Sequence, residues 1–172
     1  TDFSIPFAGQ ESVDFSPAQV FRCAALPELM IGVEICEDLW VPDPPSARLA
    51  AEGATLILNL SASDEVVGKA DYRRSLVAGQ SGRLVCGYLY ADAGEGESST
   101  DLVFAGHCLI AENGAILAER RFAGGLTISE IDVHRLCYER RRMSTFPPRS
   151  MGVYPNCFDM ALSDTVLTRH LS

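Results

Sequence analysis

The stretch IGVEICEDLW, residues 31–40, decides how the rest of the chain is interpreted. Its first half, residues 31–35, is apolar or small except for Glu34 and predicts a buried strand. Cys36 follows where this strand ends, and two acids come directly after it. Open α/β sheets place their chemistry at strand ends, and a sharp turn from strand to helix holds a thiol clear of its own backbone. The stretch therefore predicts a candidate nucleophile at Cys36; the alternative is a small apolar core cysteine.

The first half of the chain predicts a strand hairpin followed by two strand–helix units. The expected elements are a loop at 1–19, strands at 20–26, 31–35, 55–60 and 84–90, and helices at 47–52 and 69–83. Ser46 is a candidate N-cap for the first helix. In the second helix, the periodicity turns Tyr72, Leu76 and Val77 toward the core and Arg73 and Arg74 toward solvent.

The second half predicts antiparallel strands and a last helix. The expected elements are strands at 102–111, 115–122 and 126–132 and a helix at 133–142. Asn113-Gly114 lies between two alternating runs, which is a strong hairpin signal. The order βαβαβ followed by antiparallel strands predicts an α/β fold, with a mixed sheet packed against helices.

Composition narrows the class of protein. A chain of 172 residues is long enough for one domain with a core, and a net charge of −9 argues against nucleic-acid binding. No apolar run is as long as a membrane span. The six cysteines are widely spaced without a Cys-x-x-Cys pair, which favours reduced thiols in the cytoplasm. The three histidines show no metal-ligand spacing with these cysteines, so no metal or other cofactor is expected in this chain.

Polar residues follow three successive buried strands. Residues 36–38, 61–65 and 91–101 come after the strands expected at 31–35, 55–60 and 84–90. Because strand ends on one side of a sheet converge, these three loops are expected to line one pocket.

A cysteine nucleophile requires a thiolate, and therefore a base or a cation nearby. Glu37 and Asp38 are poor candidates, because adjacent side chains point apart and two carboxylates raise the pKa of a thiol. His107 lies inside a strand pattern, where a structural histidine is the alternative. Lys69, the only lysine, starts a helix, and the alternative is a surface residue. The residues alone therefore give a nucleophile without a matching base.

Four segments of the chain resemble one known family. They are EICEDLW at 34–40, NLSAS at 59–63, Gly-Lys at 68–69 with Arg73, and GEGESSTDLVF at 94–104. Together they resemble the glutaminase domain of glutamine-dependent NAD+ synthetases, which belongs to the carbon–nitrogen hydrolase (nitrilase-like) superfamily. The Glu-x-Cys-x-Asp pattern marks only the superfamily, whereas the Gly-Glu-Ser-Ser-Thr-Asp loop indicates the synthetase branch.

The resemblance implies a fold and a set of site residues. It is strongest over 29–132 and implies part of an αββα sandwich. Cys36 matches the nucleophilic cysteine of the family. Glu37 matches a position that helps to hold the oxyanion and the glutamine, Ser63 a substrate-contacting position, and Lys69 a basic residue that meets the glutamine α-carboxylate. The implied activity is glutamine hydrolysis that supplies ammonia for ATP-dependent amidation of deamido-NAD.

The resemblance also implies what this chain lacks. The family's catalytic Glu and Lys lie upstream of the cysteine, yet no lysine precedes Cys36, and Glu11 and Glu28 lie in no matching motif. We therefore expect residues 1–143 to be the C-terminal part of the glutaminase domain and residues 144–172 an extended tail or linker. ATP and Mg²⁺ would belong to a synthetase domain outside this chain.

Three expectations follow for the isolated chain. It is expected to be inactive and to form homo-oligomers through the apolar face of its half sandwich. In the complete protein, it is expected to contact the synthetase domain. The alternatives are a nitrilase-superfamily amidase or carbamoylase with another substrate, and a non-catalytic assembly module.

Overall fold

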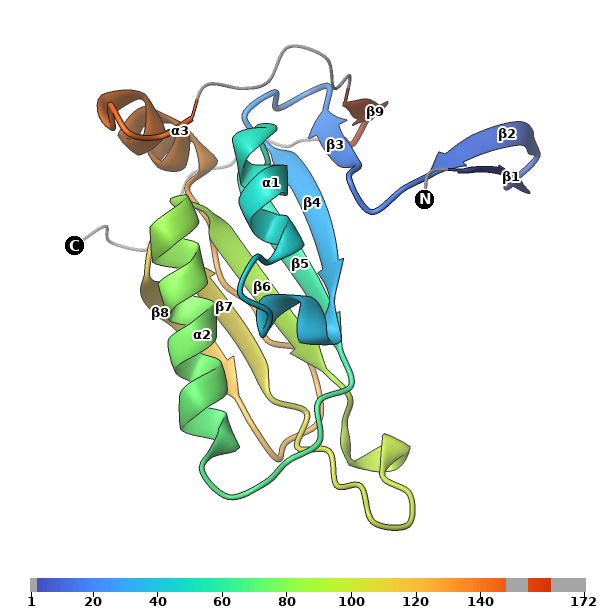
Figure 1. The fold of residues 1–172 in the computed structure, drawn as a ribbon, viewed down its shortest axis with the longest axis vertical. Helices are drawn as coiled ribbons and strands as arrows, with labels where there is room; N and C mark the ends of the chain where they lie inside the picture. Colours follow the sequence, from blue (N-terminus) through green and yellow to red (C-terminus); the bar gives the residue numbers. More distant parts are fainter. Residues whose placement is uncertain (1–2, 148–154, 162–172) are drawn as a thin grey trace.

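The fold is a mixed sheet with helices on one face (Figure 1). The computed structural model describes residues 3–147 and 155–161. The sheet has the order β8-β7-β6-β5-β4-β3-β9. Its strands are β3 (Val20–Cys23), β4 (Met30–Ile35), β5 (Leu56–Ser61), β6 (Gly87–Asp92), β7 (Cys108–Glu112), β8 (Ala115–Arg120) and β9 (Asn156–Phe158). Strands β4, β5 and β6 are parallel, and the pairs β3–β4, β6–β7 and β7–β8 are antiparallel. The predicted α/β class with a mixed sheet is confirmed.

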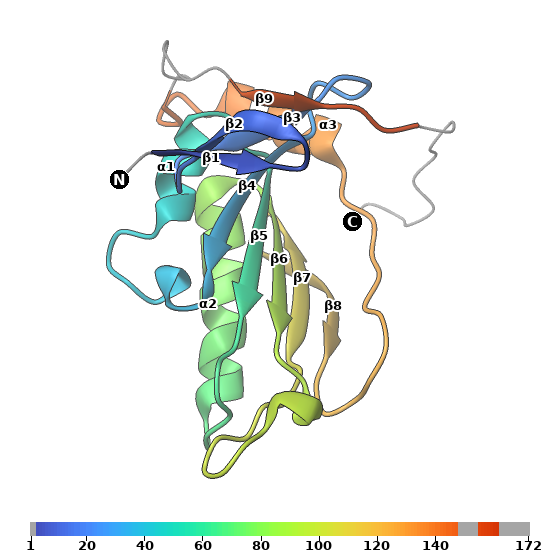
Figure 2. The same ribbon diagram turned by 90° about the vertical axis from the view of Figure 1, so that its right-hand side faces the viewer.

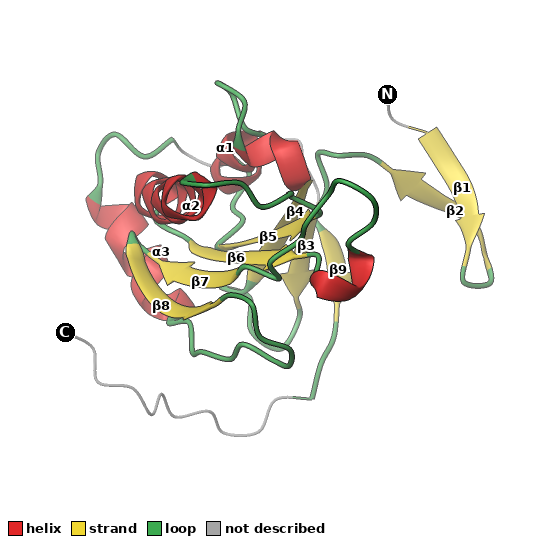
Figure 3. Ribbon diagram, turned by 90° about the horizontal axis from the view of Figure 1, so that it is seen from below, coloured by secondary structure: helices red, strands yellow, loops and turns green. Residues whose placement is uncertain are grey.

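The helices lie close to their predicted places. They are α1 (Pro45–Ala51), α2 (Lys69–Leu84) and α3 (Val133–Arg142), with short 3-10 turns η1 (Cys36–Leu39) and η2 (Glu95–Glu97). Helices α1 and α2 cover one face of the sheet (Figure 3). Helix α3 lies at the end where β5 and β6 begin, because Arg140 donates hydrogen bonds to the carbonyl oxygens of Ala54, Leu84 and Val85. In the described residues, no helix combines the length and the apolar character needed to cross a bilayer.

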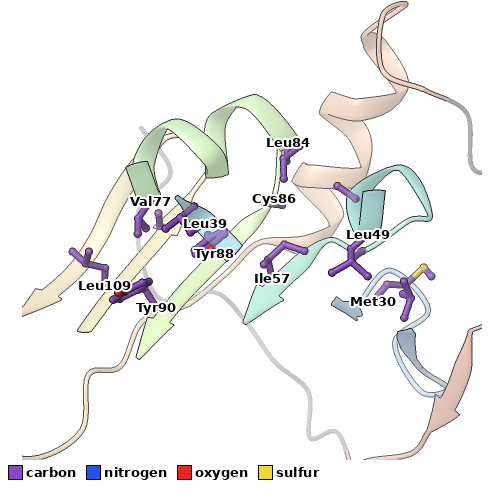
Figure 4. Packing of buried hydrophobic residues seen from close by; sticks show 14 residues of the cluster. Met30, Leu39, Leu49, Ile57, Val77, Leu84, Cys86, Tyr88, Tyr90 and Leu109 are labelled. Atoms are coloured by element: carbon purple, nitrogen blue, oxygen red, sulfur yellow. The ribbon is translucent and has the colours of Figure 1, made fainter. Parts of the chain in front are cut away.

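The core lies between the sheet and helices α1 and α2 (Figure 4). Along β4, every second residue is buried against these helices and the residues between them are more exposed. Gly32 belongs to the buried set, and an added Cβ there would lie 3.0 Å from Cβ of Leu49 on α1. A glycine at this position therefore allows the first helix to pack closely on the sheet.

The opposite face of the sheet is also apolar. Register places one row of side chains across four strands, namely Val33, Leu58, Leu89 and Ile110. The segment between β8 and α3 runs back on the side of the sheet away from α2 (Figure 2). Ile131 of this segment lies within 3.0 Å of the position that a Cβ of Gly87 would take. The segment thus covers part of the apolar face, while Ile35 and Leu60 stay more than half exposed.

The prediction of a loop at residues 1–19 is wrong. Residues 3–15 form a separate hairpin of β1 (Phe3–Phe7) and β2 (Gln10–Phe15), in which the rings of Phe3 and Phe15 lie 5.0 Å apart. Ala8 and Gly9 form the turn with φ of 50° and 79°. Gly9 suggested a loop, but a hairpin turn with positive φ requires such a residue.

Several strand predictions and one cap also differ from the structure. The strand expected at 84–90 begins only at Gly87, because Leu84 still belongs to α2, and the strand expected at 20–26 ends at Cys23. Residues 126–132 form no strand, because the segment crosses the apolar face rather than pairing with β8. The strand expected at 102–111 begins only at Cys108. Pro44 occupies the N-cap position of α1 in place of Ser46, whose backbone N–H instead donates to Glu34 Oε2 at 2.8 Å.

Candidate active site

Cys36 lies on a strained turn directly after β4. Its φ is 50°, in the left-handed region that residues with a side chain rarely adopt. The backbone N–H of Ile35 donates to Asp38 Oδ2 at 2.8 Å, which closes the turn from below. Asn59 of the neighbouring strand donates to the carbonyl oxygen of Cys36 at 3.4 Å. Such strain persists only where the surroundings hold it, and here an acid and an amide do so.

The ends of β4, β5 and β6 converge on one cavity, as their order in the chain predicts. The cavity has a volume of about 740 Å³. The residues that line it are Ile35, Cys36, Leu60, Ser61, Ala62, Ala91, Asp92, Ala93, Glu97, Ser99, Leu102 and Phe104. No lysine, arginine or histidine is among these described lining residues. The cavity thus combines an apolar wall, a thiol, hydroxyls and two acids.

The other predicted site residues are not among the described residues that line the cavity. Glu37 is exposed on the turn after Cys36. Ser63 is only 5% exposed and follows Ala62, which does line the cavity. Lys69 Nζ lies 2.5 Å from Asp64 Oδ1 and 5.6 Å from the ring centroid of Trp40. The hydrogen bond and charge of Lys69 hold the pKa of the Asp64 carboxyl below its ordinary value.

Arg73 is the residue that the sequence pattern misplaced. It was expected to face solvent, but its side chain is completely buried, whereas Tyr72, expected in the core, is 57% exposed. Arg73 Nη1 donates to Glu65 Oε2 at 3.0 Å, and Asp92 Oδ2 lies 3.9 Å from Nη2. Helical periodicity treats arginine as a surface residue and cannot see that two acids from a loop and a neighbouring strand meet it. The only signal in the sequence was the pair of acids at 64–65 shortly before the helix.

His107 is also fully buried, and both of its ring nitrogens have partners. Nδ1 lies 2.9 Å from Arg73 Nη1, and Nε2 lies 2.9 Å from Glu119 Oε1. The ring therefore connects the buried arginine to β8 and does not line the cavity of Cys36. This arrangement favours the structural role over that of a base.

The remaining features of the site are the pKa of Asp92 and the possibility of a metal site. Burial raises the pKa of Asp92 above its ordinary value, although the charge of Arg73 and the backbone N–H of Ser63 act in the opposite direction. In the described part of the chain, no three His, Cys, Asp or Glu side chains lie together in a way that could hold a metal ion. The polar side chains in the cavity wall are the thiol of Cys36, the hydroxyl groups of Ser61 and Ser99, and the carboxyl groups of Asp92 and Glu97.

Sequence comparison identifies relatives over most of the chain. The glutamine-dependent NAD(+) synthetase of Mycobacterium tuberculosis is 46% identical over 141 residues, which cover 80% of this chain and 21% of that protein. The human enzyme of the same name is 34% identical over 110 residues, 64% of this chain and 15% of that protein. The chain matches no protein-family model. The matched part spans 15–21% of the length of these relatives.

Structure comparison agrees with the sequence. A glutamine-dependent NAD(+) synthetase from Cytophaga hutchinsonii superposes with a TM-score of 0.58 and 27% identity, covering 74% of this chain and 20% of that chain. Nit3 of Saccharomyces cerevisiae, a member of the nitrilase superfamily, superposes with a TM-score of 0.58 and 20% identity, covering 71% of this chain and 44% of that chain. The chain is therefore a homologue of the glutamine-dependent NAD+ synthetases, in a part of them that has the nitrilase-like fold.

Proposed function

We propose that Cys36 is the nucleophile with which the complete protein hydrolyses the side-chain amide of glutamine. The ammonia formed would serve the ATP-dependent amidation of deamido-NAD to NAD+. The observation that carries this proposal is the place of Cys36, on a strained turn at a strand end and in the wall of a cavity. That is where an α/β fold displays a nucleophile.

The reaction divides into two steps. The thiol of Cys36 releases its proton, the thiolate attacks the amide carbon, and the C–N bond breaks. The nitrogen takes up the proton that the thiol released and leaves as ammonia, so that a thioester remains. Water then attacks the thioester, releases glutamate and returns the thiol. Both steps pass through an oxyanion, which backbone N–H groups of the turn at Glu37 would stabilise.

The substrate would be held by residues beside the cavity. Ser63 offers a hydroxyl at the end of β5, and Lys69 offers a positive charge on the first turn of α2. A point charge suits the α-carboxylate of glutamine, although it lacks the bidentate geometry of arginine. In this proposal Asp64 shares Lys69 with the substrate, because the two side chains already form an ion pair.

We also propose that this chain alone does not hydrolyse glutamine. No lysine, arginine or histidine is among the described residues that line the cavity, so no cationic side chain there stabilises the thiolate of Cys36. The same observation supports the alternative of a non-catalytic assembly module. The free state of all six cysteines supports a reducing compartment such as the cytoplasm.

ATP and Mg²⁺ do not fit the residues described in this chain. The loop at 94–100 has the glycines of a phosphate cradle, yet it lacks a lysine and carries the exposed Glu95 and Glu97, which repel phosphate. We therefore assign the ATP-dependent step to a synthetase domain outside this chain and derive no part of it from these residues.

The test uses the complete protein and two nitrogen sources. Cys36→Ala should abolish NAD+ formation from glutamine and leave NAD+ formation from ammonia within about twofold of wild type. Cys157→Ala, at an exposed cysteine far from the cavity, serves as the matched control. Continued glutamine-dependent synthesis in the Cys36 variant would show that the nucleophile is misassigned.

Two further measurements separate the alternatives. Cys36-dependent ammonia release from the purified 172-residue chain would overturn its proposed inactivity. A complete protein that forms no NAD+ from either source but hydrolyses another amide would be a nitrilase-superfamily amidase. Failure of a diazoketone analogue of glutamine to alkylate Cys36 in the complete protein would favour the assembly module.

A further inference from the structure

A fully buried arginine beside the cavity has no role in the chemistry proposed above. We infer that Arg73 is a positioning residue, which holds the loop after β5 and orients the hydroxyl of Ser63 as a hydrogen-bond donor toward the substrate. This inference rests on the proposed function, in which Ser63 contacts glutamine. The evidence is the set of hydrogen bonds around the guanidinium group.

The guanidinium group of Arg73 donates hydrogen bonds to the loop at residues 63–65. Nη2 donates to Ser63 Oγ at 3.1 Å and to the backbone carbonyl oxygens of Ser63 and Asp64, each at 3.4 Å. Nη1 donates to Glu65 Oε2 at 3.0 Å. One side chain on α2 therefore fixes three consecutive residues of the loop.

Ser63 is held from a second side by β6. Its backbone N–H donates to Asp92 Oδ1 at 2.8 Å, and the Asp92 side chain is itself buried. Asp92 lines the cavity together with Cys36. The position of Ser63 relative to the nucleophile is thus set by one contact from a helix and one from a neighbouring strand.

The direction of the hydrogen bond from Arg73 determines what Ser63 can do. A guanidinium group only donates, so Ser63 Oγ must accept from it. The hydroxyl proton then remains available for an acceptor, and the substrate competes for it with the buried Tyr90 hydroxyl, which the Ser63 side chain also reaches. A serine held in this way is a donor, which suits a carboxylate or amide oxygen of glutamine.

Stability alone does not account for this arrangement. A buried ion pair costs desolvation energy, and apolar residues of similar volume often stabilise a fold as well or better. Arg73 is instead held against the backbone of a loop whose residues Ser61 and Ala62 form part of the cavity wall. The planar guanidinium group spreads its donors over several nitrogen atoms in a rigid geometry, whereas a lysine carries all three of its donors on one nitrogen.

The test is a double-mutant cycle in the complete protein. Arg73→Lys keeps the buried charge but loses the fork, and we expect it to raise the KM for glutamine about tenfold with kcat within about twofold. In the Ser63→Ala background the same change should raise KM less than about twofold, because both substitutions remove one interaction. Arg83→Lys, at an exposed position on the same helix, is the control and should leave both constants unchanged.

Each outcome decides the inference. An unchanged KM in Arg73→Lys, additive effects in the cycle, or a fall in kcat at constant KM would overturn it. Failure of Arg73→Lys to fold, measured by thermal unfolding, would make Arg73 a residue of the core and overturn it as well. Cys36→Ala separates the proposed function from this inference. If that variant still hydrolyses glutamine, the proposed function fails. If it is fully inactive and Arg73 and Ser63 show no coupling, only this inference is rejected.

Discussion

The hydroxyl group of Tyr88 donates a hydrogen bond to Oε1 of Glu34, two residues before the candidate nucleophile. Both side chains are almost completely buried, and burial together with the charge of Glu34 raises the pKa of Tyr88, so that the hydroxyl keeps its proton. Asn59 donates in turn to the Tyr88 oxygen at 3.2 Å. A chain of hydrogen bonds thus connects the core to the turn that carries Cys36.

The substitution Tyr88→Phe tests the importance of these hydrogen bonds for stability. It leaves one oxygen of Glu34 without its donor, so we expect the free energy of unfolding to fall by about 1–3 kcal/mol. Urea denaturation measures the change. Tyr138→Phe, at an exposed tyrosine on α3, gives the reference, and an equal loss in both variants would remove the proposed importance of the buried hydroxyl.

Alanine substitutions at Gly32 and Gly79 are expected to change stability in opposite directions. Gly32→Ala would bring a Cβ to 3.0 Å from Cβ of Leu49, and we expect a loss of about 1–3 kcal/mol from overpacking. Gly79 lies inside α2 with nothing within 4 Å of an added Cβ, so Gly79→Ala should gain about 0.5–1 kcal/mol. Opposite shifts in the thermal midpoint are the expected result. A stable Gly32→Ala variant would show that α1 moves away easily.

Lys69→Met tests the carboxylate contact. The loss of one charge-assisted hydrogen bond should weaken glutamine binding by about 1.5–3 kcal/mol, which would appear as a higher KM in the complete protein. Lys69→Arg keeps the charge and should restore most of the affinity. If Lys69→Met leaves KM unchanged, the lysine serves only its ion pair with Asp64.

Asp92 should give the chain a specific pH dependence. Burial raises the pKa of Asp92 in the folded state above the ordinary value of 3.8. At a pH between 3.8 and this raised pKa, the folded state therefore binds more protons than the unfolded state. The contribution of Asp92 to the free energy of unfolding therefore falls as pH rises through this window. Relative to Asp92→Asn, wild type should gain stability on acidification from about pH 7 to about pH 4. Urea unfolding at several pH values measures the difference, with Asp71→Asn as an exposed reference, and a difference independent of pH would contradict the assignment.

We further propose that the isolated chain self-associates through the open face of its sheet. The row of apolar side chains across β4–β7 is only partly covered by the segment before α3, and a large exposed apolar patch favours association. Light scattering at micromolar concentration should detect a dimer or a larger species. Leu60→Gln on this face should weaken the association, whereas Val67→Gln, at an exposed position in the loop before α2, should not. A monomer at all concentrations would refute the proposal.

The sequence predicted those parts of the fold in which local pattern and burial agree. The bounds of α3 match the prediction, and those of α2 differ by one residue, because both helices start at an identifiable residue, Gly68 before α2 and the capping Asp132 before α3. The convergence of three strand ends at Cys36 followed from the parallel order of the strands. These features depend on contacts near in sequence or on general rules of sheet topology.

The sequence-based predictions were wrong where contacts between residues distant in sequence determine the structure. Arg73 is buried only because Glu65, His107 and Asp92 meet it in space. The run at 126–132 resembles a strand in sequence, yet Leu126 and Ile128 are largely exposed and Ile131 contacts the sheet face at Gly87 rather than a strand edge. No pattern along the chain contains this information.

The pairing of β3 with β9 has a consequence for how the chain is made. Phe21 lies opposite Asn156, so the outer edge of β3 finds its partner only after residues 156–158 have been synthesised. Until residues 156–158 leave the ribosome, a nascent chain exposes the unpaired backbone groups of that strand. Protection of this edge during translation, by a chaperone or by the ribosome surface itself, would then determine how much of the protein escapes aggregation.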